Sequence, residues 1–192
     1  MHAEPARTRA SHCRGRTARR RGGWVLGLAG LAGCTVHVPD APIEIPPALR
    51  APPDQVLFVQ TYAHGTQVYD CEDRGTPAQA SLEWVFRGPQ ATLTDRDGRV
   101  LGRHFDGPTW EWSDGSQVVG DVQARASAPQ PGAIAWLLLR AKSHSHSGLL
   151  SQTLSIQRLD TRGGEPPPQP CTAGRRAEVP YTARYHFYRA AG

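Results

Sequence analysis

Residues 118–126 read VVGDVQARA, and small or apolar side chains recur there at every second position. One alternate set comprises Val118, Gly120, Val122, Ala124 and Ala126, and the other includes Asp121, Gln123 and Arg125. Successive side chains of a β-strand point to opposite faces, whereas a helix needs apolar side chains every three to four residues. The stretch therefore predicts a half-buried β-strand whose first set faces the core.

The same alternation recurs along the rest of the chain. It is clear in residues 82–87 and 181–188, and further candidate strands lie at residues 56–62, 67–71, 91–94, 100–105, 134–142 and 153–159. Asp-Gly pairs at 97–98, 106–107 and 114–115 can supply the positive φ angles that tight turns require. We therefore predict an all-β fold, either an antiparallel β-sandwich or a closed β-barrel of about ten short strands.

Residues 1–33 have the composition of an export signal. Seven arginines precede residues 24–33, an apolar segment that is too short to cross a bilayer. The segment ends in Leu-Ala-Gly before Cys34, which resembles the lipobox of bacterial lipoproteins, where the cysteine is lipidated and the leader is removed. We predict a lipoprotein signal peptide over residues 1–33 and a membrane anchor on Cys34. An ordinary signal peptide cut nearby is the alternative.

The remainder of the chain predicts a spacer and one domain. Residues 34–54 are rich in proline, which favours extended conformations, and a single all-β domain is expected over residues 55–190. Seven of the 22 basic residues and one of the 17 acidic residues lie in the leader, which leaves 15 basic and 16 acidic residues. This balance argues against nucleic-acid binding, which needs a basic surface.

Cys71 and Cys171 are the cysteines that remain once the leader and the lipidation site are set aside. An even number of cysteines in an exported protein predicts a disulfide, here one that closes a loop of about 100 residues. Two buried free thiols are the alternative. Neither cysteine belongs to a Cys-x-x-Cys pair, so redox catalysis and structural zinc are not expected.

The densest group of polar and aromatic residues is HFDGPTWEWSDGS at residues 104–116. On a strand, Trp110 and Trp112 share a face, and two indoles can stack on a sugar ring or an aromatic ligand. The candidate ligand-binding residues are His104, Trp110, Glu111, Trp112 and Asp114. In the alternative interpretation, a tryptophan fills the core and the aspartates form turns.

His144 and His146 are the candidate metal ligands. They lie two residues apart and would share a face of an extended segment, where two imidazoles can bind copper or zinc if a third ligand lies near. A solvated hairpin tip is the alternative. The sequence contains no Gly-x-Ser-x-Gly, no His-Glu-x-x-His and no phosphate-binding loop, so we predict no catalytic residues and no cofactor.

Several spaced phrases occur together in this chain. They are WVF at 84–86 before GP at 88–89, DG at 97–98 before GRH at 102–104, GPTWE at 107–111, DGS at 114–116, WLLL at 136–139, IQRL at 156–159, and YTA at 181–183 before FY at 187–188. Over residues 45–188 the chain resembles the exported bacterial and fungal family catalogued as domain of unknown function 3455. The resemblance implies export, but the family has no established activity and assigns no site residue.

These features favour a lipid-anchored, all-β domain of the cell envelope that binds a small molecule, a glycan or a protein without catalysis. One alternative is a small envelope hydrolase acting on carbohydrate, which requires His104, Glu111 and Asp114 to converge in one pocket. The other alternative is a metal-binding protein that uses His144 and His146.

Overall fold

A computed structural model of the chain describes residues 42–76 and 78–192. The predicted leader, Cys34 and the first part of the spacer lie outside the described residues. The described part forms eight strands: β1 (Gln55–Asp73), β2 (Leu82–Thr94), β3 (Val100–Phe105), β4 (Thr109–Trp112), β5 (Gln117–Ala126), β6 (Trp136–Ser145), β7 (Ser155–Gly163) and β8 (Arg176–Ala190). Two short 3-10 segments accompany them, η1 (Pro47–Leu49) and η2 (Leu149–Gln152). No helix in this part is long and apolar enough to span a membrane.

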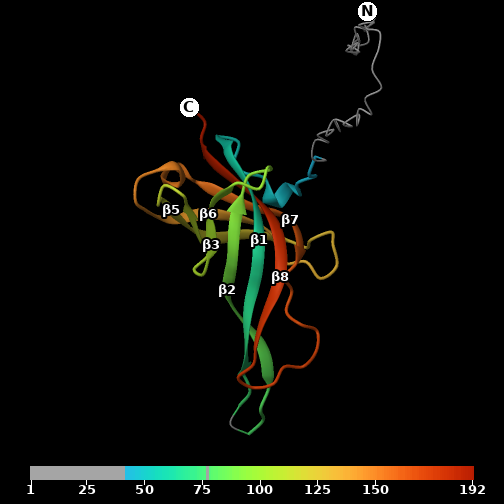
Figure 1. The fold of residues 1–192 in the computed structure, drawn as a ribbon. Helices are drawn as coiled ribbons and strands as arrows, with labels where there is room; N and C mark the ends of the chain where they lie inside the picture. Colours follow the sequence, from blue (N-terminus) through green and yellow to red (C-terminus); the bar gives the residue numbers. More distant parts are fainter. Residues whose placement is uncertain (1–41, 77) are drawn as a thin grey trace, which may run out of the picture. The chain divides into compact units, whose positions relative to one another are not determined.

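The eight strands close into one barrel. Each strand pairs antiparallel with the next strand along the chain, and β8 pairs antiparallel with β1 (Figure 1). Closure gives every strand two neighbours and leaves no unpaired sheet edge. The all-β prediction is therefore confirmed, and of its two architectures the structure has the barrel.

The observed number of strands, eight, is lower than the predicted number of about ten because two long strands were each predicted as two short ones. They are β1, predicted as residues 56–62 and 67–71, and β2, predicted as residues 82–87 and 91–94. Gly65 lies inside β1, and a Cβ atom at this position would collide with the backbone carbonyl of Gln90 in β2. Glycine here permits close approach of two backbones and does not interrupt the strand.

The predicted alternation of β5 holds over only part of the strand. Val122 packs against the main core inside the barrel, and the pairing with β6 then shifts register between Val122 and Ala124. The extra residue, Gln123, forms a bulge, and a shift of one residue exchanges the two faces of a strand. Ala124 and Ala126 consequently pack outside the barrel, where the sequence predicted the inner face, and Arg125 borders the interior.

A second, smaller core lies on the outer face of the barrel. Leu49 of η1 is fully buried and clusters with Trp136 of β6 and Leu159 of β7. Ile43 and Ile45 pack against the same cluster. The last part of the predicted spacer therefore belongs to the folded domain, because its apolar residues cover one side of the sheet.

The connections between strands alternate between the two ends of the barrel. At the end that carries the C terminus, η2 places the fully buried side chain of Leu150 in the main core, and we name this the covered end. The β1–β2 hairpin lies at the opposite end (Figure 1), together with the β3–β4, β5–β6 and β7–β8 connections. We name this the open end, because the candidate site reaches the surface there.

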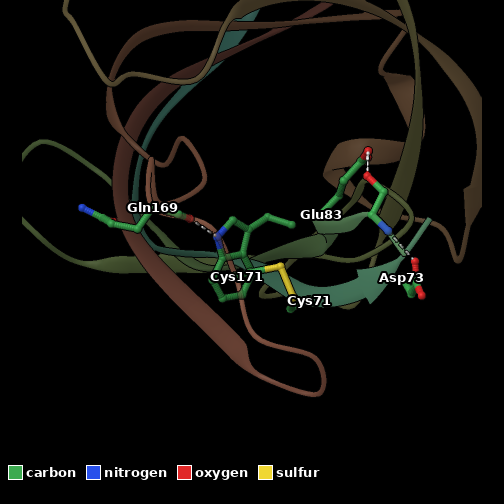
Figure 2. The surroundings of a disulfide bond; sticks show 7 residues. Cys71, Asp73, Glu83, Gln169 and Cys171 are labelled. Carbon is green, nitrogen blue, oxygen red and sulfur yellow. Dashed lines mark hydrogen bonds between the residues drawn. A yellow bond between two sulfur atoms is a disulfide. The ribbon is translucent and has the colours of Figure 1, made fainter. Parts of the chain in front are cut away.

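The predicted disulfide is present at the open end. It joins Cys71 of β1 to Cys171 in the β7–β8 connection, with 5.7 Å between the Cα atoms (Figure 2). The backbone N–H of Cys71 donates to the carbonyl oxygen of Arg175 at 2.8 Å. The indole N–H of Trp84 in β2 donates to the carbonyl oxygen of Gln169 at 3.3 Å (Figure 2). The β7–β8 connection is thus fastened to both β1 and β2.

Candidate functional site

The interior of the barrel contains a cavity of about 540 Å³, and all eight strands contribute to its wall. Its lining is mostly apolar, and its volume falls within the range of about 300–1,000 Å³ that is usual for small-molecule sites. Phe86, Asp106 and Glu165 border the cavity and are exposed to solvent. The cavity therefore opens to the surface at the open end of the barrel.

Leu137, Arg158 and Tyr185 form one row across β6, β7 and β8. The register pairs Leu137 with Arg158 and Arg158 with Tyr185, and all three residues line the cavity. Directly opposed residues of an antiparallel pair point to the same face of the sheet. The guanidinium of Arg158 thus lies among apolar inner residues, and its Nε donates to the carbonyl oxygen of Ala135 at 3.0 Å.

Three buried polar atoms beside the cavity have no hydrogen-bond partner within residues 42–76 and 78–192. They are Nε2 of Gln67, Nε1 of Trp110 and the hydroxyl of Tyr185, and each side chain is at most 1% exposed. Tyr181 lies near both Gln67 and the Tyr185 hydroxyl, and Arg158 also lies near that hydroxyl. None of them makes a hydrogen bond of good geometry with Gln67 Nε2 or the Tyr185 hydroxyl. An unmade hydrogen bond of a buried group costs about 1–3 kcal/mol. Because the three atoms are fully buried, a partner from the cavity can reach them only if neighbouring side chains shift.

His104 contributes a neutral ring to the cavity wall. Its Nδ1 lies 2.8 Å from the carbonyl oxygen of Thr109, which only accepts hydrogen bonds. Nδ1 therefore carries the hydrogen, and Nε2 is left as an acceptor. Burial lowers the pKa of His104 to about 3, so the ring is uncharged at neutral pH.

Tyr69 and Phe86 flank the opening of the cavity. Arg87 is the extra residue of a bulge between β1 and β2, and this bulge sets Phe86 opposite Tyr69 with 5.5 Å between ring centroids. The hydroxyl of Tyr69 donates to the carbonyl oxygen of Gly164 at 2.7 Å. The hydrogen bond holds the start of the β7–β8 connection at the rim, while Phe86 remains 49% exposed.

The structure places three of the predicted ligand-binding residues inside the barrel. His104 and Trp110 line the cavity, and Trp112 packs against the main core. The two tryptophans share the inner face of β4, as the alternation predicted. However, Trp110 is only 1% exposed and one of its ring faces is covered by His104, so the two indoles form no open stacking surface.

Glu111 lies on the outer face of β4, away from the cavity. Nε and Nη2 of Arg103 in β3 donate to its two carboxylate oxygens at 2.8 and 3.1 Å. Nε2 of Gln117 in β5 donates to the same carboxylate at 2.5 Å. The hydrogen bond from Arg103 and then that from Gln117 lower the pKa of Glu111, so the side chain is an ionised partner in a surface network.

Asp114 lies at the covered end, in the connection between β4 and β5. Its carboxylate accepts hydrogen bonds from the hydroxyl of Ser116 at 2.6 Å and from the backbone N–H of Leu149 at 2.8 Å, and the Ser116 hydroxyl is the largest cause of its lowered pKa. The carboxylate therefore fixes η2. His104, Glu111 and Asp114 lie inside the barrel, on its outer face and at its covered end, so they do not share a pocket.

His144 and His146 lie near the end of β6 and beyond it. Nε2 of His144 is 2.8 Å from the carbonyl oxygen of Thr153, and His146 has a positive φ of 60°. The described residues include no group of three or more His, Cys, Asp or Glu side chains arranged to hold a metal ion. In this part of the chain, the two histidines have no third ligand beside them.

Most residues that line the cavity were not predicted from the sequence, among them Gln67, Arg158 and Tyr185. The sequence did contain one signal for Arg158. In the segment IQRL, this charged residue alternates with the buried Ile156 on one face of β7. Alternation alone does not indicate that such a face encloses a hollow space.

Comparison with known proteins gives a family but no described activity. No curated protein and no solved structure matches the chain. A family model matches residues 52–189, which include nearly the whole barrel from β1 to β8. The family of exported proteins and the disulfide both agree with the predicted export. The chain belongs to the family described as protein of unknown function (DUF3455).

Proposed function

We propose that this domain is an exported, non-catalytic binding module that holds one small, largely apolar molecule inside its barrel. The observation that carries this proposal is the cavity of about 540 Å³, walled by all eight strands and open at one end. A barrel of eight strands either fills its interior with side chains or holds one small ligand. The unfilled volume here supports the second arrangement.

The chemistry of the lining supports binding over reaction. Val122, Leu137 and Leu139 supply apolar wall, and burying apolar ligand surface against such a wall is favourable. Acid–base candidates along the described lining include His104, which burial keeps neutral, and the exposed rim residues Asp106 and Glu165. Burial raises the pKa of the lining residues Tyr69 and Tyr185, which keeps their hydroxyls protonated. The candidates are split between the interior and the rim, and no nucleophile–base pair is formed with His104, whose Nδ1 is bonded to a backbone carbonyl.

Binding can be measured with N-phenyl-1-naphthylamine, a neutral apolar dye whose fluorescence rises in an apolar site. The protein purified after export is expected to bind the dye saturably at one site. Val122→Trp, on the inner face of β5, should fill the cavity and abolish most of the signal. Val119→Trp, on the outer face of the same strand, is the matched control and should bind normally. Equal binding by both variants would refute the cavity as the site.

We also propose that the domain is tethered to a membrane through a lipid on Cys34, with residues 1–33 removed. The support is the order of arginines, apolar segment and Leu-Ala-Gly-Cys in the sequence. Two acyl chains give stable anchoring without a transmembrane helix. Cys34→Ser should release the protein from the membrane fraction or leave it unprocessed. A mature, membrane-bound Cys34→Ser protein would contradict the anchor.

A further inference from the structure

We propose that the natural ligand is a monoanionic amphiphile, an apolar molecule with one carboxylate-type group, and that Arg158 binds this group inside the barrel. The inference rests on the proposed function, because it names the ligand class for the same cavity. It starts from the position of Arg158, which stands in one inner row between Leu137 and Tyr185. Its Nε is fixed by the carbonyl oxygen of Ala135, which leaves the terminal nitrogens for a ligand.

Arg158 has no carboxylate partner within ion-pair distance among residues 42–76 and 78–192. By contrast, arginines on the outside of the barrel form such pairs, among them Arg103 with Glu111 and Arg176 with Asp70. A charge in an apolar interior is costly unless it is paired and hydrogen-bonded. A ligand anion would supply the partner that the described chain does not provide.

The charge of Arg158 acts on the other polar groups of the interior. Burial raises the pKa of Tyr69 and Tyr185, and the positive charge of Arg158 opposes both rises. For His104, burial is the main cause of the lowered pKa, and Arg158 lowers it further. The lining also includes Arg87 and Arg125 and the exposed carboxylates of Asp106 and Glu165, so its cations outnumber its anions by one. Arg158 is the cation whose charge reaches Tyr69, His104 and Tyr185, and this excess favours an anion over a cation.

Three further hydrogen-bond donors belong to side chains that line the same cavity. Nε2 of Gln67 and Nε1 of Trp110 carry hydrogens and act as donors, and the hydroxyl of Tyr185 can also donate. The guanidinium of Arg158 is the primary donor to a carboxylate, and these buried groups can add hydrogen bonds where neighbouring side chains shift on binding. The remaining wall, which includes Val122 and Leu139, suits an apolar body.

Two dyes distinguish the contribution of the anionic group to binding from that of the apolar body. N-Phenyl-1-naphthylamine is neutral, and 8-anilino-1-naphthalenesulfonate has the same ring system with one sulfonate. The exported chain should bind the sulfonate dye about tenfold more tightly than the neutral dye, a difference of about 1.4 kcal/mol. Arg158→Gln should remove this preference while changing the affinity for the neutral dye by less than about twofold.

Two further variants define the role of the charge. Arg162→Gln removes an arginine from the same strand at an exposed position outside the cavity lining, and it should retain the full preference. Arg158→Lys keeps the charge without the planar fork, and it should retain part of the preference. Equal effects of Arg158→Gln and Arg162→Gln would overturn the proposal.

A second measurement needs no substitution and remains informative if Arg158→Gln fails to fold. Decanoate and decanol are compared as competitors of the bound neutral dye in the unaltered protein. Decanoate should displace the dye at a concentration about tenfold lower than decanol. Equal potency would reject the anion site while leaving the proposed function intact. Failure of the neutral dye to bind at all would instead reject the proposed function.

Discussion

His104 and Trp110 lie flat against each other, with ring centroids 4.3 Å apart and ring planes only 8° from parallel. They are directly opposed in the β3–β4 register, so the contact is a cross-strand pair on the inner face of the barrel. Tyr185 of β8 meets both rings edge-on. The most conspicuous cluster of the sequence is therefore a packed aromatic wall, with a neutral imidazole as one of its rings.

The neutral imidazole makes stability depend on pH. Because the pKa of His104 is about 3 in the folded protein and about 6.5 in an unfolded chain, protonation favours unfolding. Its stabilising effect is complete above about pH 6.5 and decreases as the pH falls toward 3, with a loss of about 2 kcal/mol by pH 5. His104→Phe should show a smaller decrease between pH 7 and pH 5 in urea unfolding. Parallel pH curves for the two proteins would contradict the buried neutral ring.

The disulfide should contribute a large part of the stability. Cys71 and Cys171 are 100 residues apart, and the chain-entropy model gives about 4.7 kcal/mol for a loop of this length. We expect the double variant Cys71→Ser and Cys171→Ser to lose about 4 kcal/mol in urea unfolding. Reduction of the disulfide in the unaltered protein should lower the free energy of unfolding by a similar amount. A loss below about 1 kcal/mol would show that the link does not restrain the unfolded chain.

The packing of η1 on the outer face of the barrel should contribute as much to stability as a contact in the main core. Leu49 is fully buried against Trp136 and Leu159, so Leu49→Ala leaves a hole in a packed cluster. We expect a loss of about 3 kcal/mol in the free energy of unfolding. Leu57→Ala is the matched control, since Leu57 is 46% exposed, and should cost less than about 1 kcal/mol. Similar costs at both positions would mean that η1 is not held against the barrel.

Glu111 provides a test of the outer surface. Its pairing with Arg103 is solvent-exposed, and such pairs contribute about 0–1 kcal/mol. Glu111→Gln should therefore change stability by less than about 1 kcal/mol and leave dye binding unchanged. A large loss of binding would place this carboxylate in the function, contrary to its position on the far side of β4.

The period of two was sufficient to predict the all-β class, because a strand that packs on one face shows it directly. Residues 100–105 coincide with β3, and the cysteine pair was identified from number and compartment. The reversal at Gln123 could not be predicted, since a bulge is a property of two paired strands and depends on where β6 lies.

The cavity residues could not be predicted for a related reason. β7 is buried on both faces: Ile156 and Arg158 face the interior, while Gln157 and Leu159 lie under the residues around η1. A strand covered on both sides gives no sign of which side encloses space. Only closure of the sheet places the side chain of Arg158 in the interior.

The up-and-down order of the strands places their connections alternately at two opposite ends of the barrel. Turns at residues 95–99 and 113–116 serve one pole of the molecule, and loops at residues 127–135 and 164–175 serve the other. Substitutions in the second pair would change the rim of the cavity without altering the covered end. Under the proposed function, the shape of the ligand that enters would be decided by the loops of the open end, and the strands would stay the same.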